Sequence, residues 1–183
     1  MKMETENLIL RNSVFADCEK ICEWETDPEN RKFFSLDSDR TYEDVVVDFV
    51  NDNQDPEKEL YTIYLKPDDK KIGHIVLSRI NHHRDTMALK AVVIGEAEYR
   101  HHGYGEEAVR QVLEYAFLQL HMERVTTDHF KDNEYFEALA HKVGFRDEGI
   151  LRHAGKKDGK YLDLYTMSIL RAEYFNSLDR DTE

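Results

Sequence analysis

The chain has 183 residues, with 38 acidic against 25 basic side chains and a formal net charge of −13. This length predicts a single domain over residues 1–183, and the acidic balance argues against nucleic acid as a partner, because such binding depends on neutralising phosphates. No apolar run approaches the ~20 residues of a membrane span and the N-terminus lacks the apolar core of a signal peptide, so we expect a soluble, cytoplasmic protein with no membrane partner.

The first half of the chain predicts one strand, two helices and an antiparallel meander. The first helix should end before Pro28, and Thr41 and Asp44 resemble a capping box in front of the second. Turn residues separate the three strands of the meander. The expected elements lie at residues 8–11, 17–26, 45–50, 59–66, 71–80 and 86–94.

The second half alternates helices with strands after a glycine-containing turn. The turn is Arg100-His101-His102-Gly103-Tyr104-Gly105, and the elements after it are expected at residues 105–120, 123–130, 133–143, 146–152 and 160–170. Strands followed by helix, strand, helix and two strands indicate one α/β domain with a mixed sheet.

The glycine turn indicates a ligand that carries a diphosphate. Backbone N–H groups at a helix N-terminus lack intrahelical partners, and glycines allow a phosphate to approach them. Gly103-x-Gly105-x-x-Ala108 also satisfies the dinucleotide fingerprint, with Glu123 as the ribose-binding acid. However, residues 95–102 separate the turn from the preceding strand, whereas a dinucleotide-binding fold requires the glycine directly after it.

Four motifs in chain order resemble the GNAT (Gcn5-related) N-acetyltransferases. R-x-x-G-x-G at 100–105 resembles their pyrophosphate loop, and N-x-x-x-x-x-L-x-x-K-V-G-F at 133–145 resembles their second cofactor-facing helix. The opening at residues 4–11 and the end at 159–170 resemble the branch of ribosomal-protein Nα-acetyltransferases and spermidine N-acetyltransferases.

The resemblance implies an α+β fold whose mixed, mostly antiparallel sheet is flanked by helices. Strands Leu89–Ile94 and Glu123–Phe130 would splay apart, with acetyl-CoA as cosubstrate between them. The main chain of one splayed strand would pair with pantetheine, the glycine turn would hold the pyrophosphate, and an asparagine would bond the pantetheine arm. The implied cofactor-binding residues are Val93, Ile94, Arg100, His101, His102, Gly103, Tyr104, Gly105 and Asn133.

The catalytic residues are less well defined. The acceptor amine must lose a proton before it attacks, and the leaving thiolate benefits from an acid. The family commonly has a tyrosine for this acid five residues before the motif's phenylalanine, where this chain has Ala140. We expect His129 as the first catalytic candidate, followed by His74 and Glu96, although a histidine in a strand is more often structural.

Other patterns have simpler interpretations. The paired histidines His82-His83 and His101-His102 lack the spacing of metal ligands, so we expect no metal site. Cys18 and Cys22 indicate reduced thiols rather than a disulfide. Phe33-Phe34, on an expected loop, favours the wall of an acceptor pocket, and the acidic residues over 23–29 favour a solvated helix face.

These observations predict an acetyl-CoA-dependent N-acetyltransferase that acts directly on a primary amine. A polyamine and a peptide N-terminus are the main acceptors considered, and amino-acid or aminoglycoside amines stay open. The alternative is a CoA-binding module with little or no turnover, because of Ala140. A third hypothesis is an interaction domain on the same fold. The resemblance also leaves a homodimer or larger homo-oligomer open.

Overall fold

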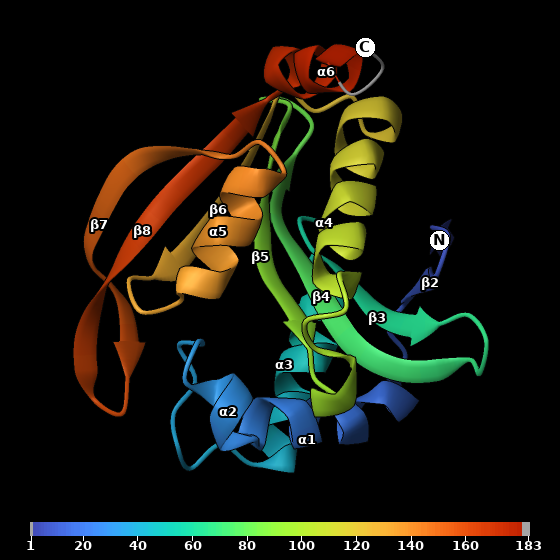
Figure 1. The fold of residues 1–183 in the computed structure, drawn as a ribbon. Coiled ribbons are helices and arrows are strands. Elements are labelled where there is room, and N and C mark those ends of the chain that lie inside the picture. The colour runs from blue at the N-terminus through green and yellow to red at the C-terminus, as the bar shows by residue number, and fades with distance from the viewer. Residues whose placement is uncertain (1, 181–183) are drawn as a thin grey trace.

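The computed structural model describes residues 2–180, which form an eight-stranded sheet with helices on both faces (Figure 1). The strand order is β1-β2-β3-β4-β5-β6-β8-β7, and in this part of the chain the β5–β6 pair alone is parallel. The strands are β1 (Lys2–Glu4), β2 (Leu8–Asn12), β3 (Glu59–Leu65), β4 (Lys70–Asn81), β5 (Thr86–Ile94), β6 (Arg124–Phe130), β7 (Arg146–Lys157) and β8 (Lys160–Leu170). The predicted mixed, mostly antiparallel sheet is therefore confirmed.

The helices divide into two groups, and Figure 1 shows α1, α2 and α3 together at one end of the sheet. The first group is α1 (Cys18–Thr26), α2 (Pro28–Arg31) and α3 (Tyr42–Gln54), and the second is α4 (Tyr104–Glu114), α5 (Glu134–Lys142) and α6 (Arg171–Arg180). Short 3₁₀ turns cover Phe15–Asp17 and Ala97–Tyr99, and a π-helical segment covers Tyr115–Gln119.

Local signals in the sequence account for several element boundaries. The predicted capping box is present, because the Asp44 N–H donates to the Thr41 hydroxyl (3.3 Å) and the Thr41 N–H donates to the Asp44 carboxylate (2.8 Å). The helix expected over 105–120 changes to π geometry at Tyr115, whose buried hydroxyl donates to Glu59 (3.0 Å). β1, α2 and α6 were not predicted.

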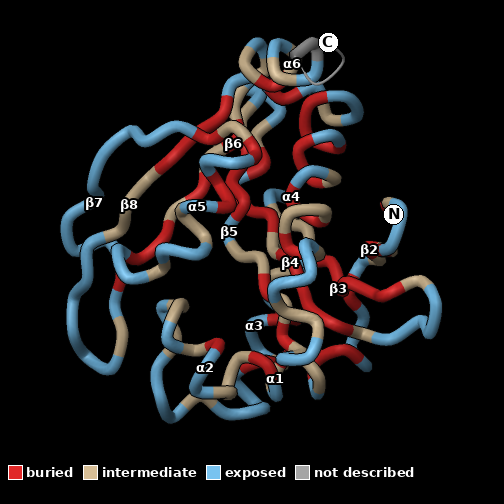
Figure 2. Tube along the Cα trace, in the orientation of Figure 1, coloured by how far each residue is buried: buried red, intermediate tan, exposed pale blue. Residues whose placement is uncertain are grey.

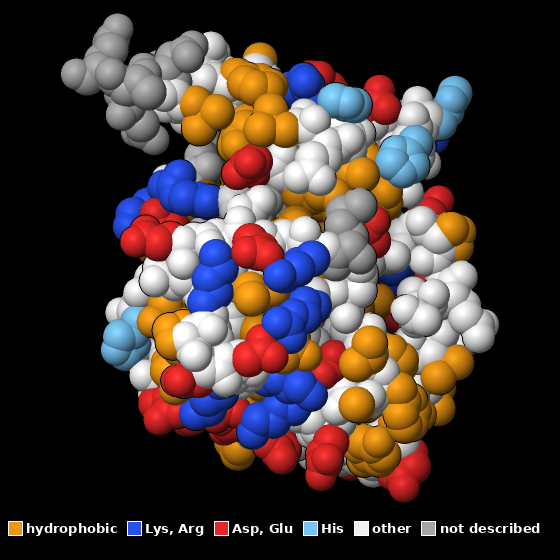
Figure 3. Space-filling model, turned by 90° about the vertical axis from the view of Figure 1, so that its right-hand side faces the viewer, with side chains coloured by type: hydrophobic (Ala, Val, Ile, Leu, Met, Phe, Trp, Pro, Cys, Tyr) orange, Lys and Arg blue, Asp and Glu red, His pale blue; other side chains and the backbone are white. Residues whose placement is uncertain are grey.

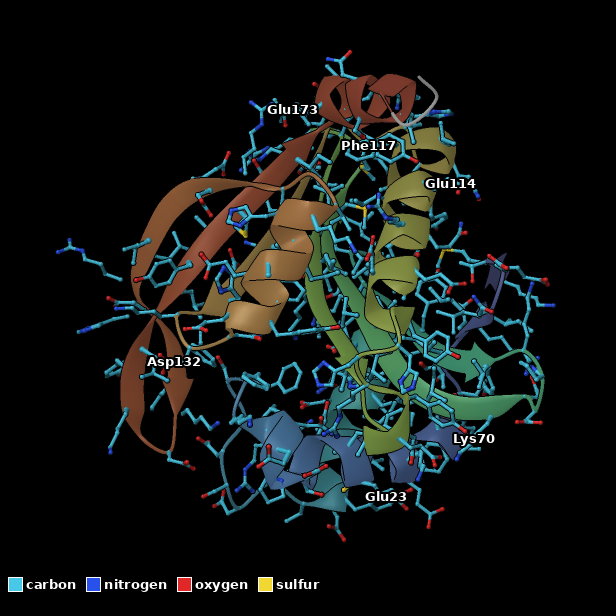
Figure 4. The ribbon with its side chains drawn as sticks, viewed as in Figure 1. Glu23, Lys70, Glu114, Phe117, Asp132 and Glu173 are labelled. Carbon is cyan, nitrogen blue, oxygen red and sulfur yellow. The ribbon has the colours of Figure 1, made fainter. Side chains whose placement is uncertain are left out.

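Two apolar clusters hold the layers together, and Figure 2 shows buried residues concentrated in β3–β6 and on the inner side of α4. The larger cluster joins the sheet to α4, α5 and α6, where the rings of Phe117 and Tyr174 stack at 4.9 Å (Figure 4 labels Phe117). The smaller cluster joins α1 to α3 and consists of Cys18, Ile21, Trp24, Val45 and Phe49.

β5 and β6 separate part of the way along their length. Their pairing covers Thr86–Leu89 against Arg124–Thr127 and ends there, while both strands continue in different directions (Figure 1). The register of β5 against β4 also shifts at this point, from Leu89 opposite Leu77 to Ala91 opposite Val76, which leaves Lys90 as a bulge. The predicted splay is confirmed.

The face of the molecule in Figure 3 carries basic side chains interspersed with acidic ones. At the sheet edge formed by β1 and β2, ion pairs join Arg11 to Asp69 (2.5 Å) and Lys66 to Glu4 (3.5 Å). No helix in residues 2–180 is long and apolar enough to cross a membrane.

Candidate active site

A cavity of about 330 Å³, here called the splay cavity, lies where β5 and β6 separate. Helix α5 and the glycine turn complete its walls. Its lining includes six residues that we predicted to bind cofactor, namely Val93, Ile94, Arg100, His101, Gly105 and Asn133. His102, Gly103 and Tyr104, also predicted, lie in the adjoining turn and outside this lining.

The glycine turn has the backbone that a phosphate site requires. Gly103 is the N-cap of α4 and has a φ of +86°, a conformation that side chains rarely adopt. A Cβ built on Gly105 would meet Leu139 at 3.8 Å and Ile94 at 3.9 Å, so the bare backbone leaves space at the first turn of α4. The turn can therefore accept an anionic group at the helix N-terminus.

Two predicted cofactor residues already have protein partners. The Arg100 guanidinium donates to the carbonyl oxygens of Ile94 (3.1 Å) and Gly95 (2.7 Å) and pairs with Asp27 (3.3 Å). It therefore fastens the glycine turn to the end of β5. Asn133 caps α5 by accepting from the Phe136 N–H at 3.2 Å, and its amide NH₂ group donates to no described residue.

A second, larger cavity of about 1190 Å³, here called the acceptor cavity, lies between α1, α3 and the same splayed strands. Six residues line both cavities and are here called the junction, and they are Phe33, Phe34, Lys90, Ala91, Asp128 and His129. Phe33 and Phe34 lie in turns after α2, as the sequence predicted. A ligand in the splay cavity could therefore touch a ligand in the acceptor cavity at the junction.

The acceptor cavity is predominantly acidic. Its acidic lining residues are Glu25, Asp37, Asp39, Asp44, Asp48, Asp52, Asp55, Glu57 and Asp128, and its basic ones are Arg40, Lys58, Arg79 and Lys90. Arg40 pairs with both Glu25 (2.7 Å) and Asp48 (2.8 Å). Burial raises the pKa of Glu25, although Arg40 opposes the rise. The excess of carboxylates favours a cationic ligand.

His129, our first catalytic candidate, lies at the junction. Its Nδ1 is 2.9 Å from the Phe130 carbonyl oxygen, which can only accept, so Nδ1 carries the proton. In a neutral imidazole Nε2 is then an acceptor, and here it is buried without a partner among the described residues. A buried acceptor atom without a partner is uncommon in proteins.

The other two candidates have different surroundings. His74 lines the acceptor cavity and stacks on Trp24 at 6.1 Å, and burial together with the nearby Arg40 lowers its pKa to about 4. Glu96 lines neither cavity, and its carboxylate pairs with Lys20 (2.8 Å) and accepts from the Trp24 indole (3.0 Å). The position of Glu96 therefore does not support the catalytic role that we predicted for it.

Ala140, at the position of the family tyrosine, is buried in the larger core cluster. Tyr135 lines the splay cavity instead, and its ring packs edge-on against His101 at 5.3 Å, beside the glycine turn. Within residues 2–180, no three His, Cys, Asp or Glu side chains are grouped so that they could hold a metal ion.

The hairpin between β7 and β8 braces the loop that carries the two junction phenylalanines. The Lys157 ammonium donates to the Arg31 carbonyl (2.6 Å), and the Asp158 carboxylate accepts from the Ser38 N–H (2.6 Å). The Asp158 N–H in turn donates to Asp37 (2.6 Å). These contacts join segments about 120 residues apart, and no local sequence signal indicated them.

Comparisons with known proteins agree with this fold. The family model described as "Acetyltransferase (GNAT) domain" matches residues 7–146. The chain is 27% identical over 176 residues to the "uncharacterized N-acetyltransferase p20" of Bacillus licheniformis, covering 93% of this chain and 96% of that protein. It is also 27% identical over 107 residues to the spermidine N(1)-acetyltransferase of Escherichia coli K12, covering 58% and 56% of the two chains.

Solved structures share the fold. The spermidine N-acetyltransferase from Vibrio cholerae in complex with CoA and spermine superposes with a TM-score of 0.82 at 19% identity, covering 94% of this chain and 100% of that one. A GNAT-family acetyltransferase from Bacillus anthracis superposes with a TM-score of 0.79 at 25% identity, with coverage of 94% and 100%.

Proposed function

The chain belongs to the GNAT acetyltransferase family, and from that premise we propose that it transfers acetyl from acetyl-CoA directly to a primary amine of a polyamine. A peptide N-terminus is the second candidate acceptor. The observation that carries this proposal is the junction, where a cavity suited to a phosphate-bearing ligand meets an acidic cavity. Related proteins named as spermidine acetyltransferases support the polyamine.

The proposed site of acetyl-CoA is the splay cavity. Backbone N–H groups at the turn from His101 to Gly105 would hold the pyrophosphate, and the β5 main chain at Val93 and Ile94, unpaired with β6, would bond pantetheine. Asn133 has free amide donors for the same arm. When bound, acetyl-CoA supplies an activated acyl group, and the residues present fit it.

The acceptor cavity would bind the other substrate. A free alkyl amine has a pKa near ~10, so it arrives as an ammonium and must lose a proton before it reacts. Carboxylates of the acceptor cavity would attract the cation and hold the distal amines of a polyamine. We propose the Nε2 atom of His129 as the base that takes the proton at the junction.

The test is a CoA-release assay on acetyl-CoA with spermidine, spermine, a peptide N-terminus and free amino acids, together with calorimetric titration of CoA. We expect turnover on the polyamines, with the acetylated product identified by mass spectrometry. His129→Gln should lower kcat roughly 100-fold, whereas His121→Gln, at an exposed site outside both cavities, should not.

Each other outcome of these assays would indicate a different function for the chain. Turnover restricted to the peptide would favour the second acceptor. Tight CoA binding without turnover on any amine would favour the CoA-binding module, with Ala140 as the physical reason. Absence of CoA binding would refute the proposed site.

A further inference from the structure

The proposed reaction has one chemical requirement that none of the residues named so far meets. When acetyl passes to an amine, the new C–N bond forms and the C–S bond breaks, and the sulfur keeps the electron pair of that bond. The proton of the amine can go to His129, but the charge on the departing sulfur needs a donor or a cation. Ala140 has neither.

Lys90 differs from the other cations of the two cavities. Within residues 2–180 it is the one cationic residue of their linings that forms no ion pair. The others and their partners are Lys32 with Glu29 (2.7 Å), Arg40 with Glu25 (2.7 Å), Lys58 with Asp52 (2.5 Å), Arg79 with Asp128 (3.2 Å) and Arg100 with Asp27 (3.3 Å). The Lys90 ammonium is therefore free to meet a ligand.

The backbone explains why Lys90 lies at the junction. It is the first residue of β5 beyond the last pair with β6, Leu89 with Thr127. It is also the bulged residue against β4, and a bulge redirects a side chain out of the regular alternation. Lys90 thus lines the splay cavity and the acceptor cavity at once, three residues before the proposed pantetheine contact at Val93.

The titratable and charged groups near the Lys90 ammonium are residues that line the two cavities. Glu25 of α1 lies close enough for Lys90 to act on its pKa, though burial dominates that shift. His74 and Arg79 of β4 and Asp128 and His129 of β6 complete the charged and titratable surroundings, with Arg40 from the loop before α3. The hydroxyl of Tyr135 is an alternative donor, but Tyr135 lies against His101 at the glycine turn rather than at the junction.

We propose that Lys90 is a catalytic residue whose ammonium stabilises the departing CoA thiolate, in place of the tyrosine that Ala140 replaces. This inference rests on the proposed function. No proton transfer from Lys90 is needed, because an ammonium normally titrates above a thiol and an ion pair suffices. Lys90 is exposed in the free chain, and two bound substrates would displace water and strengthen the pair. The same charge disfavours a second ammonium at the junction and so favours the neutral, reactive amine.

The experiment compares Lys90→Met, which removes the charge, with Lys90→Arg, which keeps it. Lys131→Met, at an exposed position outside both cavities, is the matched control. The first readout is the pH titration of the thiol of bound CoA, which is monitored through the ultraviolet absorbance of the thiolate. The second is kcat with acetyl-CoA and spermidine, and binding of desulfo-CoA reports whether each variant is folded with an intact site.

We expect Lys90→Met to raise the pKa of the bound thiol by about one unit or more and to lower kcat roughly 100-fold. Lys90→Arg should restore most of both, and desulfo-CoA should bind all variants alike. An unchanged thiol titration in Lys90→Met, with normal desulfo-CoA binding, would overturn the inference while leaving the proposed function in place. A shifted titration without turnover by the wild-type chain would support the charge effect and refute the proposed function.

Discussion

His74 offers a quantitative test of how the acceptor cavity is built. The imidazole is 5% exposed and stacked on Trp24, and its Nε2 atom has no partner among the described residues. Burial, with a smaller effect of Arg40, lowers its pKa to about 4 from an ordinary value of 6.5. As the pH falls, His74 therefore binds a proton in the unfolded chain at a higher pH than in the native chain. The contribution of His74 to the free energy of unfolding is complete above about pH 6.5 and decreases as the pH falls toward 4.

Replacing His74 by Phe removes the titration and keeps an aromatic ring against Trp24. From the two pKa values, the wild-type chain should lose ~2 kcal/mol of stability relative to the variant on going from pH ~8 to pH ~5, and ~3 kcal/mol by pH ~4. Urea unfolding at these pH values measures the difference, and the data near pH 8 are the internal control because His74 is then neutral in both states. Parallel stability curves for the two proteins would refute a buried, neutral His74.

Three further substitutions test other contacts. Gly105→Ala should stabilise the fold by ~0.5–1 kcal/mol, because the added Cβ would meet only ordinary contacts at 3.8 Å. The same methyl group should weaken CoA binding roughly tenfold. Equal CoA affinities of the two proteins in calorimetry would contradict a phosphate site at the glycine turn. Gly73→Ala would place a Cβ 1.9 Å from the Val93 carbonyl oxygen, so we expect a loss of at least ~3 kcal/mol, and a wild-type urea midpoint would rule out this close approach. Glu25→Gln should change the free energy of unfolding by less than ~1 kcal/mol, because burial disfavours the Glu25 charge and Asp48 still neutralises Arg40. A loss of the ~3–5 kcal/mol of a broken buried pair in urea unfolding would contradict this.

Local sequence signals predicted much of the fold. The bounds of β5 and the capping box of α3 depend on neighbouring residues, so the sequence alone was sufficient to find them. The splay of β5 and β6 came from the family resemblance, and the structure confirms it. The short helix that begins at Pro28 and the π segment at Tyr115 were missed, since apolar periodicity does not distinguish such turns from loops or from α-helix.

The candidate site was less predictable because it depends on contacts across the sheet. Lys90 becomes a bulge only because its neighbours Leu89 and Ala91 pair with β4 while it does not, and nothing in the local sequence marks it. The sequence likewise could not show that Arg100 turns toward the carbonyl groups of Ile94 and Gly95. The contact of Asp158 with the loop at Ser38 joins distant segments. Charge composition argued against nucleic acid as a partner, but it could not show the cavity that gathers the carboxylates.

The proposed reaction requires the acetyl group to move between substrates at the junction of the two cavities. A crystal structure of the chain with CoA and spermidine bound would show whether the two ligands meet there. We expect pantetheine between β5 and β6, the sulfur beside Lys90 and His129, and the polyamine along the carboxylates of the acceptor cavity. CoA bound outside the splay cavity, or a polyamine that does not reach the junction, would contradict it.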